Sequence, residues 1–446
     1  MPPGIGWRPL QVLIASPVYA PCIGGGERLV QAVAESLAGR GHTVTVVTLN
    51  AATQQDMYTQ DGAGLPSHEV LNGVRVHRVA PGGGRSARAL RWWLRQRGGW
   101  RSTRLLLGED PGWFLGPPSA AGMLAPLLFT RADVVVSANW HFSSAAAVQC
   151  AGRVRGLPVV GLPLFHIARP WADRPRYRPL LRGCSTVIAL TEAEAGFVRA
   201  RGALRVEVIG CGVDPARFAS ASGAEIRRRH KIGDRPVVGF IGRQDTLKGV
   251  PTLIEAMRLT WKEVPESILL LAGQSAHRDR ETQECLNRLD SAEREKVRLV
   301  DDFPHEEGPH LCAACDLVAI PSVEESFGLV FLEGWMVRRP VIGVRIPSTV
   351  CVIEDGQDGL IANPMDPVDL ARAILRLIRH PGERAAMGER GHQKAVSRFT
   401  LDRITDRWEE VLVARTGRRS GANQGRKRER SSAVGTRHSA RTPNQP

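Results

Sequence analysis

Short apolar runs alternate with longer amphipathic stretches along most of this chain. The first run, Gln11–Ala15, has the length and composition of a buried strand. In the next stretch, Glu27–Ala38, apolar residues recur on one helical face, and Thr43–Thr48 then has the pattern of a second strand. Alternation of this kind predicts parallel strands joined by crossover helices.

The same alternation runs through the chain twice. In the first half, further strands are expected at Val74–Val79, Val134–Ser137, Pro158–Gly161 and Thr186–Ala189. A second cycle begins at Val237–Ile241 and continues with the helix Pro251–Thr260 and the strands Ile268–Ala272, Val297–Leu299, Leu317–Ile320 and Val341–Val344. Because 446 residues exceed one ordinary domain, we expect two α/β domains.

The domain boundaries are expected where this pattern changes. A first domain would span 1–212 and a second domain 213–398, with the hinge near Gly210–Ser222. A last helix at 399–415 carries apolar residues at helical spacing, with Trp408 as its expected anchor. Residues 416–446 are rich in Arg, Ser, Gly and Pro and have little to bury, so we expect a disordered basic tail.

The net charge of +15 is concentrated in two segments. Arg85–Arg104 contains seven arginines and no acid, and Arg415–Pro446 contains nine basic residues and one acid, so the rest of the chain is neutral. The basicity therefore belongs to two patches, and we expect no nucleic-acid partner for the fold itself.

The cysteines predict neither a metal site nor a disulfide framework. Cys312 and Cys315 lie on one expected helix, and no second Cys/His pair stands at zinc-finger spacing. We therefore expect buried structural thiols, no bound metal and a reducing cytoplasm. No apolar run approaches the roughly 20 residues that span a bilayer, and Met1–Leu10 lacks the apolar core of a signal peptide.

The stretch 317–336 has the strongest chemical pattern. The apolar run Leu317–Ile320 predicts a strand, a Pro-Ser turn follows, and apolar residues then recur at helical spacing. Free backbone N–H groups at the start of such a helix suit a phosphate, and Gly328 lets the backbone approach closely. Glu325 in the loop and Glu333 on the helix, eight positions apart, could hold hydroxyl groups on either side of that phosphate.

Two further loops carry candidate binding groups. Gly24–Gly26 follows the first strand and would let backbone approach a diphosphate or an acceptor, although an ordinary turn has the same composition. Arg243 and Lys248 follow the strand Val237–Ile241 and could stabilise a leaving diphosphate without a metal, by about 4 kcal/mol per charge pair at an effective dielectric of 20. Solvated loop charges are the alternative.

Taken in order, these motifs resemble retaining glycosyltransferases of family GT4. The pattern is a carboxylate, Ser-Phe-Gly and a second Glu at 325–333, and the matching segments are Gly24–Glu27, Leu190–Glu192, Val208–Asp214, and Gly239–Arg243 with Lys248-Gly249. The similarity spans roughly residues 10–413. It implies an α/β fold of the GT-B type: two Rossmann-like domains with parallel sheets facing a central cleft, and a C-terminal helix that crosses back to the first domain.

The resemblance also implies roles for the site residues. Glu325 would be catalytic and bind donor-sugar hydroxyls, and Glu333 would bind the donor ribose. The donor diphosphate would be bound by Arg243, Lys248, Phe327, Gly328, Leu329, Gly25 and Gly26. A histidine that contacts the donor sugar is expected after the strand Val134–Ser137; His141 is the candidate, with Asn139 or a purely structural histidine as alternatives. The family's Gly-Gly pair is missing at Gly343–Ser348, so the resemblance does not identify the donor sugar.

The implied activity is transfer of a sugar from a UDP- or GDP-linked donor to a hydroxyl of a glycan or lipid-linked acceptor. It would proceed with retention of configuration, with the leaving phosphate helping to deprotonate the acceptor, and with no metal or other cofactor. Three alternatives stay open: a nucleotide-sugar epimerase on the same fold, a basic membrane- or nucleic-acid-binding protein with a degenerate cleft, and an inactive family member.

The segment Arg85–Leu107 combines Trp and Leu residues with a separate row of arginines. A basic amphipathic segment of this kind suits an anionic membrane surface, and would bring a cytoplasmic enzyme to the inner face of the plasma membrane. An ordinary helix of the first domain with a solvated arginine face fits the same pattern.

Overall fold

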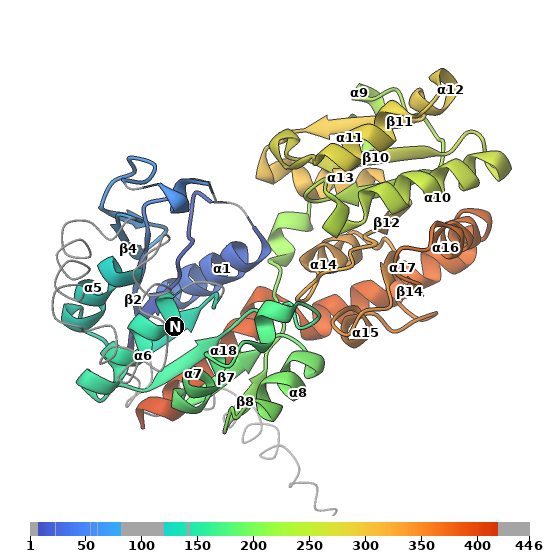
Figure 1. Cartoon of the computed structure of the whole chain (residues 1–446). Helices are drawn as coiled ribbons and strands as arrows, with labels where there is room; N and C mark the ends of the chain where they lie inside the picture. The colour runs from blue at the N-terminus through green and yellow to red at the C-terminus, as the bar shows by residue number, and fades with distance from the viewer. Residues whose placement is uncertain are drawn as a thin grey trace, which may run out of the picture.

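Buried strands form two separate sheets in the computed structural model, which describes residues 8–22, 24–53, 55–59, 61–81, 120–140 and 143–417. Within these residues, the first sheet has eight strands in the order β3-β4-β2-β1-β5-β6-β7-β8. The second has six, in the order β11-β10-β9-β12-β13-β14. The two α/β domains that the sequence predicts are confirmed, and Figure 1 shows them side by side.

The first domain alternates strands and helices, as its pattern predicts. Its strands are β1 (Gln11–Ala15), β2 (Thr43–Leu49), β3 (His68–Leu71), β4 (Val74–Val79), β5 (Val134–Ala138), β6 (Val159–Leu162), β7 (Thr186–Ala189) and β8 (Val206–Val208). Its helices are α1 (Gly25–Gly39), α5 (Leu124–Phe129), α6 (Ser144–Arg155), α7 (Tyr177–Gly183) and α8 (Glu192–Ala200), with short 3-10 helices at η1 (Asp56–Tyr58), η2 (Ala120–Met123) and η3 (Pro170–Asp173).

The outer edge of this otherwise parallel sheet is a hairpin that the sequence interpretation did not single out. β3 pairs antiparallel with β4, whereas β4, β2, β1, β5, β6, β7 and β8 run parallel to their neighbours. The connection is the two-residue turn Asn72-Gly73, with φ of 47° and 83°. Asn-Gly adopts positive φ at little cost, so the chain reverses directly into a hairpin where a crossover helix would otherwise be needed.

The second domain follows the same plan. Its strands are β9 (Val237–Ile241), β10 (Ile268–Gly273), β11 (Val297–Asp301), β12 (Leu317–Ala319), β13 (Val341–Val344) and β14 (Gly359–Ala362). Its helices are α9 (Ala224–Arg229), α10 (Val250–Glu263), α11 (Arg280–Asn287), α12 (Ser291–Arg294), α13 (Gly308–Ala314), α14 (Leu329–Met336), α15 (Thr349–Val352), α16 (Pro367–Arg379) and α17 (Pro381–Arg398), with η4 (Pro215–Phe218), η5 (Thr246–Lys248), η6 (Ser275–His277) and η7 (His305–Glu307).

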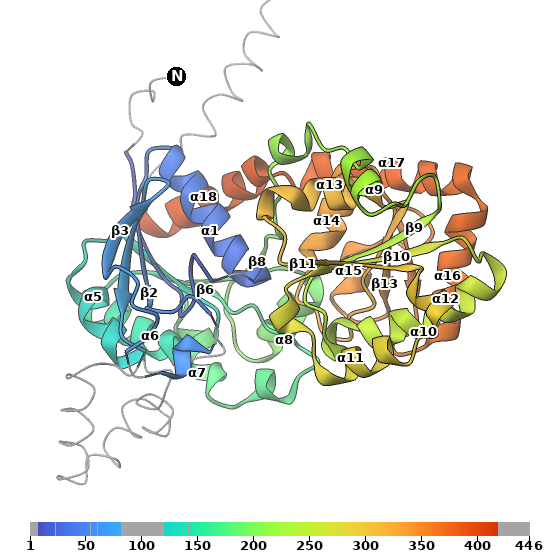
Figure 2. The same ribbon diagram turned by 90° about the horizontal axis from the view of Figure 1, so that it is seen from above.

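The chain crosses between the domains twice, and the two crossings are hydrogen-bonded to each other. The N–H of Val213 donates to the carbonyl of Phe399 at 2.9 Å, and the N–H of Leu401 donates back to the carbonyl of Val213 at 2.8 Å. The last helix, α18 (Leu401–Thr416), then lies beside α1 in the first domain (Figure 2). Trp408 on α18 is 2% exposed, so the expected return helix is confirmed.

The loops that carry the candidate chemistry lie at the carboxyl ends of their strands. β1 leads into the glycine loop at the start of α1, β9 into η5, and β12 into the loop before α14. β9 and β12 are neighbours in the second sheet, so their loops leave the sheet side by side. Crevices at the carboxyl ends of parallel strands are where open α/β sheets bind their ligands.

Candidate functional site

The loop after β9 is shaped by two capping residues. The side chain of Asp245 accepts a hydrogen bond from the N–H of Lys248 at 2.8 Å, which holds the one-turn helix η5. Gly249 ends this turn with φ 75° and ψ 20°, and any Cβ there would lie 2.2 Å from the carbonyl oxygen of Pro321. Glycine is therefore needed twice, for the left-handed backbone and for the close approach to the loop after β12.

Lys248 and Glu325 form an ion pair between these two loops. The Lys248 Nζ lies 2.6 Å from Glu325 Oε2, and the side chains are only 18% and 14% exposed. Ser348, in the segment where the family's Gly-Gly pair is missing, donates a 2.6 Å hydrogen bond to the carbonyl of Glu325. The loop that carries Glu325 is thus held by Lys248 on one side and by Ser348 on the other. The Lys248–Glu325 pair is partly shielded from water, and charges interact more strongly there than in bulk water.

Glu333 lies on α14 and faces the other domain. The helix starts after Gly328, which has φ 93° and ψ 65°, and a Cβ added at Gly328 would lie 2.4 Å from the Phe331 ring. The Glu333 carboxylate is 12% exposed and lies 3.7 Å from the guanidinium of Arg28 on α1. Burial raises the pKa of Glu333, while Arg28 and Arg217 act to lower it.

The glycine loop brings α1 against the same region from the first domain. A Cβ at Gly24 would overlap the carboxylate of Glu27, and one at Gly26 would lie 2.9 Å from the side chain of Leu164, whereas Gly25 borders open space. Burial raises the pKa of the Glu27 carboxyl, and its own backbone N–H and the charge of Arg243 oppose the shift. Arg243, which is 41% exposed, therefore lies close enough to the glycine loop to act on it electrostatically.

A second interdomain contact sits next to Glu325. The carboxylate of Glu324 is 2.8 Å from His166 Nδ1 and 2.6 Å from Arg169 Nε, both on the loop after β6. Burial raises the pKa of Glu324, but the hydrogen bonds from His166 and Arg169 outweigh it and bring the pKa to about 2. Glu324 is therefore a charged bridge between the two domains at neutral pH.

The structure brings together most of the residues that the sequence nominated. Arg243, Lys248 and Glu325 come from adjoining loops of the second domain, and Glu333 comes from α14. Helix α1, which begins at Gly25 and Gly26, approaches them from the first domain through Glu27 and Arg28. Phe327, by contrast, points its ring into the hinge: it packs edge-on to Phe399 at 5.6 Å between ring centres. Gly328 and Leu329 start α14 as expected.

His141 lies outside the described residues. Asn139, its alternative, is buried, with φ 56°, and its N–H donates to the carbonyl of Leu162 at 3.0 Å. His166, which the sequence interpretation did not single out, follows β6 and contacts Glu324 directly. The sequence pattern that could have identified it is a histidine four residues beyond a buried strand, at the carboxyl edge of the sheet.

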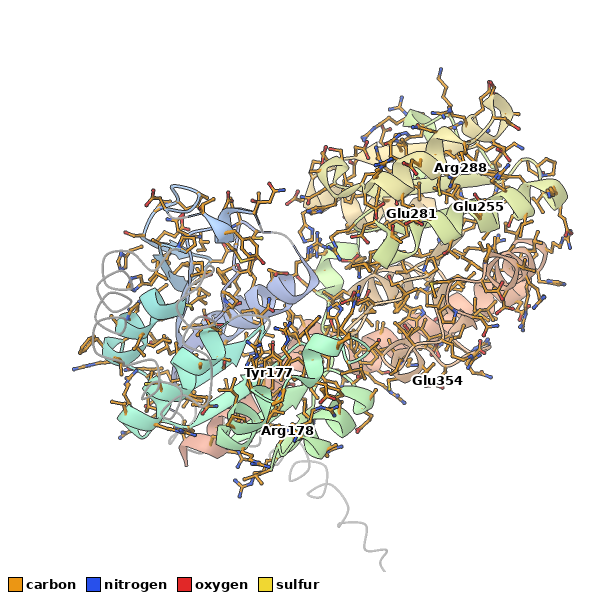
Figure 3. All side chains as sticks on the ribbon, in the orientation of Figure 1. Tyr177, Arg178, Glu255, Glu281, Arg288 and Glu354 are labelled. Carbon is orange, nitrogen blue, oxygen red and sulfur yellow. The ribbon has the colours of Figure 1, made fainter. Side chains whose placement is uncertain are left out.

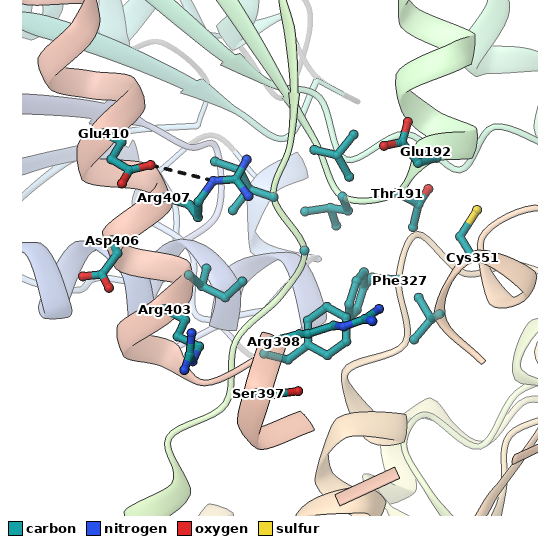
Figure 4. A pocket seen from close by; sticks show the side chains of 17 residues that line it. Thr191, Glu192, Phe327, Cys351, Ser397, Arg398, Arg403, Asp406, Arg407 and Glu410 are labelled. Carbon is teal, nitrogen blue, oxygen red and sulfur yellow. Dashed lines mark ion pairs between the residues drawn. The ribbon is translucent and has the colours of Figure 1, made fainter. Parts of the chain in front are cut away.

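A separate pocket of about 860 Å³ lies at the domain junction (Figure 4). Its walls are the start of α8, the linker 208–210, Phe327, α15 and the turn from α17 into α18. Arg407 on this wall pairs with Glu207 at 3.6 Å and with Glu410 at 4.0 Å. Lys248, Glu325 and Glu333 do not line the pocket; among the described residues that the sequence nominated for the site, Phe327 lines it.

The described residues contain no group of three or more His, Cys, Asp or Glu side chains that could hold a metal ion. No helix in the described ranges is long and apolar enough to cross a membrane. The segment Arg85–Leu107 lies outside the described residues, as does the tail from residue 418; α18 itself extends to Thr416.

Comparison with known proteins identifies both halves of the chain. The model "Glycosyltransferase Family 4" matches residues 23–217, and "Glycosyl transferases group 1" matches residues 223–394. The chain is 32% identical over 276 residues to the D-inositol 3-phosphate glycosyltransferase of Salinispora tropica, a match that covers 54% of this chain and 57% of that relative. The chain thus spans little more than half the length of this relative.

A second relative is matched over more of its length. The lipopolysaccharide core biosynthesis glycosyltransferase LpsE of Rhizobium meliloti is 32% identical over 254 residues, which cover 56% of this chain and 70% of LpsE. Among solved structures, Anabaena HepE in complex with UDP and glucose has a TM-score of 0.68 at 20% identity, covering 91% of this chain and 100% of HepE. This likeness confirms the GT-B fold. The chain belongs to the group 1 glycosyltransferases, with a Family 4 glycosyltransferase domain in its first half.

Proposed function

We propose that this protein transfers a sugar from a nucleotide-diphosphate sugar to a hydroxyl group of an acceptor, with retention of configuration. The observation that carries the proposal is the Lys248–Glu325 ion pair, which joins the loops at the carboxyl ends of the neighbouring strands β9 and β12. Family membership supports the sugar-transfer class and does not favour an epimerase or a basic binding protein.

The donor diphosphate would lie between the two domains. Arg243 and Lys248 would approach it from the second domain, together with the backbone of Phe327, Gly328 and Leu329. Gly25 is open to solvent space, so backbone of the first domain could approach from the other side. Two cations and several backbone N–H groups would stabilise the charge that develops on the leaving phosphate, the task that a metal ion performs in other enzymes.

The two carboxylates would bind hydroxyl groups of the donor. Glu325, which pairs with Lys248, would accept hydrogen bonds from the sugar, and Glu333 would accept them from the ribose. Because Glu333 lies 3.7 Å from Arg28 on α1, the Arg28 guanidinium would lie at the edge of the ribose site. The acceptor would enter from the first domain, and the leaving phosphate would take its proton.

His166 joins His141 as a candidate for the histidine that contacts the donor sugar. Its ring is held by Glu324, the residue next to Glu325, and this places it at the domain interface beside the candidate sugar site. His141 keeps its place as a prediction from the sequence.

UDP-linked donors are the first to try, because the HepE structures hold UDP and UDP-glucose. GDP-linked donors are the second choice. The names of the relatives suggest acceptors of the glycolipid or sugar-phosphate kind, consistent with a glycan or lipid-linked acceptor. We further propose a cytoplasmic enzyme with domain boundaries at 1–212, 213–398 and 399–415, which reaches a membrane acceptor through the segment Arg85–Leu107.

The test is release of nucleoside diphosphate from a panel of UDP- and GDP-sugars, with and without a mixture of glycan and glycolipid acceptors. The wild-type protein should release it in an acceptor-dependent way, and Glu325→Ala should not. Glu266→Ala is the matched control, because Glu266 is an exposed carboxylate of the same domain. Turnover that needs no acceptor and returns an isomerised nucleotide sugar would instead identify an epimerase.

A further inference from the structure

We propose that Glu194 is a positioning residue for the transfer reaction, and that its carboxylate fixes the loop carrying His166 and Arg169 against the donor-binding loop of the second domain. The inference rests on the proposed function and extends it to a group that touches neither donor nor acceptor.

Glu194 lies in the first turn of α8 and is 2% exposed. Its Oε1 accepts a hydrogen bond from the N–H of Phe165, and its Oε2 accepts one from the N–H of Leu190, both at 2.8 Å. One side chain thus joins the segment after β6 to the segment after β7. Within the described residues the carboxylate makes no ion pair with a cation, and the two N–H groups are its hydrogen-bond donors.

The segment that Glu194 holds is the one that contacts the second domain, through His166 and Arg169. Leu164, just before Phe165, has φ 57°, an uncommon conformation for a residue with a branched side chain, and it needs support from its surroundings. A Cβ at Gly26 would lie 2.9 Å from the Leu164 side chain. His166, directly after Phe165, contacts Glu324 at 2.8 Å. A change at Glu194 would therefore move the glycine loop contact and the His166 contact together.

Packing of the Phe165 ring is the competing explanation for the order of this loop. The ring lies among aromatic side chains: 4.9 Å from Tyr177 (labelled in Figure 3), 5.8 Å from Phe197 and 5.9 Å from Trp171, between ring centres. Ring packing fixes the position of Phe165, but it does not satisfy the backbone N–H. A buried N–H without a partner is costly, so the carboxylate should remain necessary.

Protonation of Glu194 would make the order of this loop depend on pH, whereas packing of the Phe165 ring alone would not. Burial raises the pKa of Glu194 to about 7, and the N–H groups of Leu190 and Phe165 oppose the shift. The titratable groups nearby are the Cys211 thiol on the linker, whose raised pKa keeps it neutral, the His166 ring on the held loop, and Glu325, which acts on Cys211 from the second domain. A protonated carboxyl places an O–H where an acceptor is required, so the hydrogen bonds from Phe165 and Leu190 should weaken as the pH falls through about 7.

The experiment compares wild type, Glu194→Gln, Glu194→Asp and the control Glu192→Gln, which changes an exposed carboxylate of the same helix turn. Amide hydrogen exchange of the peptide 163–169 is measured for each, without any substrate. Rates of transfer and affinities for UDP are then measured from pH 6 to pH 8.5. Thermal unfolding checks that each variant is folded, and Glu194→Asp keeps the charge if Glu194→Gln fails to fold.

We expect faster exchange in the 163–169 peptide of Glu194→Gln but not of Glu192→Gln. The transfer rate of Glu194→Gln should fall by about 10-fold or more, because small misplacements of contacting groups are costly. The affinity for UDP should fall by less than the transfer rate, because Arg243, Lys248 and Glu333, the proposed nucleotide contacts other than the glycine loop, lie in the second domain. The wild-type rate should fall below pH 7, and this step should vanish in Glu194→Gln. Unchanged exchange, or a full transfer rate in folded Glu194→Gln, would overturn the proposal. A wild type that transfers no sugar would count against the proposed function, and the exchange result would still decide whether Glu194 holds the loop.

Discussion

Replacement of Lys248 by Ala is the most informative single change in the candidate donor site. The Lys248 Nζ lies 2.6 Å from Glu325 and on the loop that is expected to hold the donor diphosphate. A pair of unit charges about 4 Å apart interacts by about 4 kcal/mol at an effective dielectric of 20. Because each 1.4 kcal/mol corresponds to about a tenfold change in rate, loss of the whole interaction with the leaving phosphate would slow transfer by about 1000-fold.

The same change should also lower stability. Removing one partner of a buried ion pair costs about 3–5 kcal/mol. Glu325 and Lys248 are 14% and 18% exposed, so the pair is only partly removed from water and we expect a smaller loss, of about 2 kcal/mol. The fold should survive this loss, because native domains are stable by about 5–15 kcal/mol.

The assay is release of nucleoside diphosphate by wild type, Lys248→Ala and the control Lys262→Ala. Lys262 is an exposed cation near the far end of α10, so its loss removes the same charge from the domain without touching the site. Lys262→Ala should keep the wild-type rate. If folded Lys248→Ala released diphosphate at more than about a tenth of the wild-type rate, direct charge stabilisation by Lys248 would be refuted.

Three further changes test other parts of the structure. Glu324→Gln should lower the melting temperature at pH 7, because the depressed pKa of Glu324 contributes stability above the ordinary value of 4.5. The difference in melting temperature from wild type should shrink as the pH falls from 4.5 toward 2. A difference that does not change with pH would contradict the role of Glu324 as a charged bridge. Gly249→Ala should destabilise by about 2 kcal/mol or more in urea unfolding, because it combines positive φ with a clash against Pro321, whereas Gly196→Ala, in an open helical position, should stabilise by about 0.5–1 kcal/mol. Trp408→Ala should cost about 3–5 kcal/mol and loosen α18 from the first domain, seen as faster hydrogen exchange in that helix; unchanged exchange would refute its anchoring role.

Much of the site was predictable because its signals are local. The strand–loop–helix at 317–336 follows from an apolar run, a Pro-Ser turn and helical spacing, and the structure has this order. Lys248-Gly249 after β9 was predictable for the same reason. The short strands β8 and β14 were missed, because β8 has a glutamate between its two valines and β14 begins at a glycine, so neither is the uninterrupted apolar run that marked β12.

The interdomain contacts were not predictable from local patterns. Arg28 and Glu333 stand in different domains, and nothing in either segment indicates that they meet. Glu324 was set aside because it lacks the eight-residue spacing, yet tertiary packing makes it the bridge to His166. The Asn72-Gly73 hairpin is a different case: its turn signal is local and strong, and the expectation of uniform alternation hid it.

The measurement that tests the central claim most directly is thermal unfolding of wild type and Lys248→Ala in the presence of UDP, GDP and their common sugar conjugates. A ligand at 100 times its dissociation constant stabilises a folded protein by about 2.7 kcal/mol, which is a readable shift. We predict that one nucleotide family stabilises the wild type and that Lys248→Ala loses most of this shift. If no nucleotide shifts the wild type, or if the variant keeps the full shift, the cleft around Lys248 and Glu325 is not a nucleotide-sugar site.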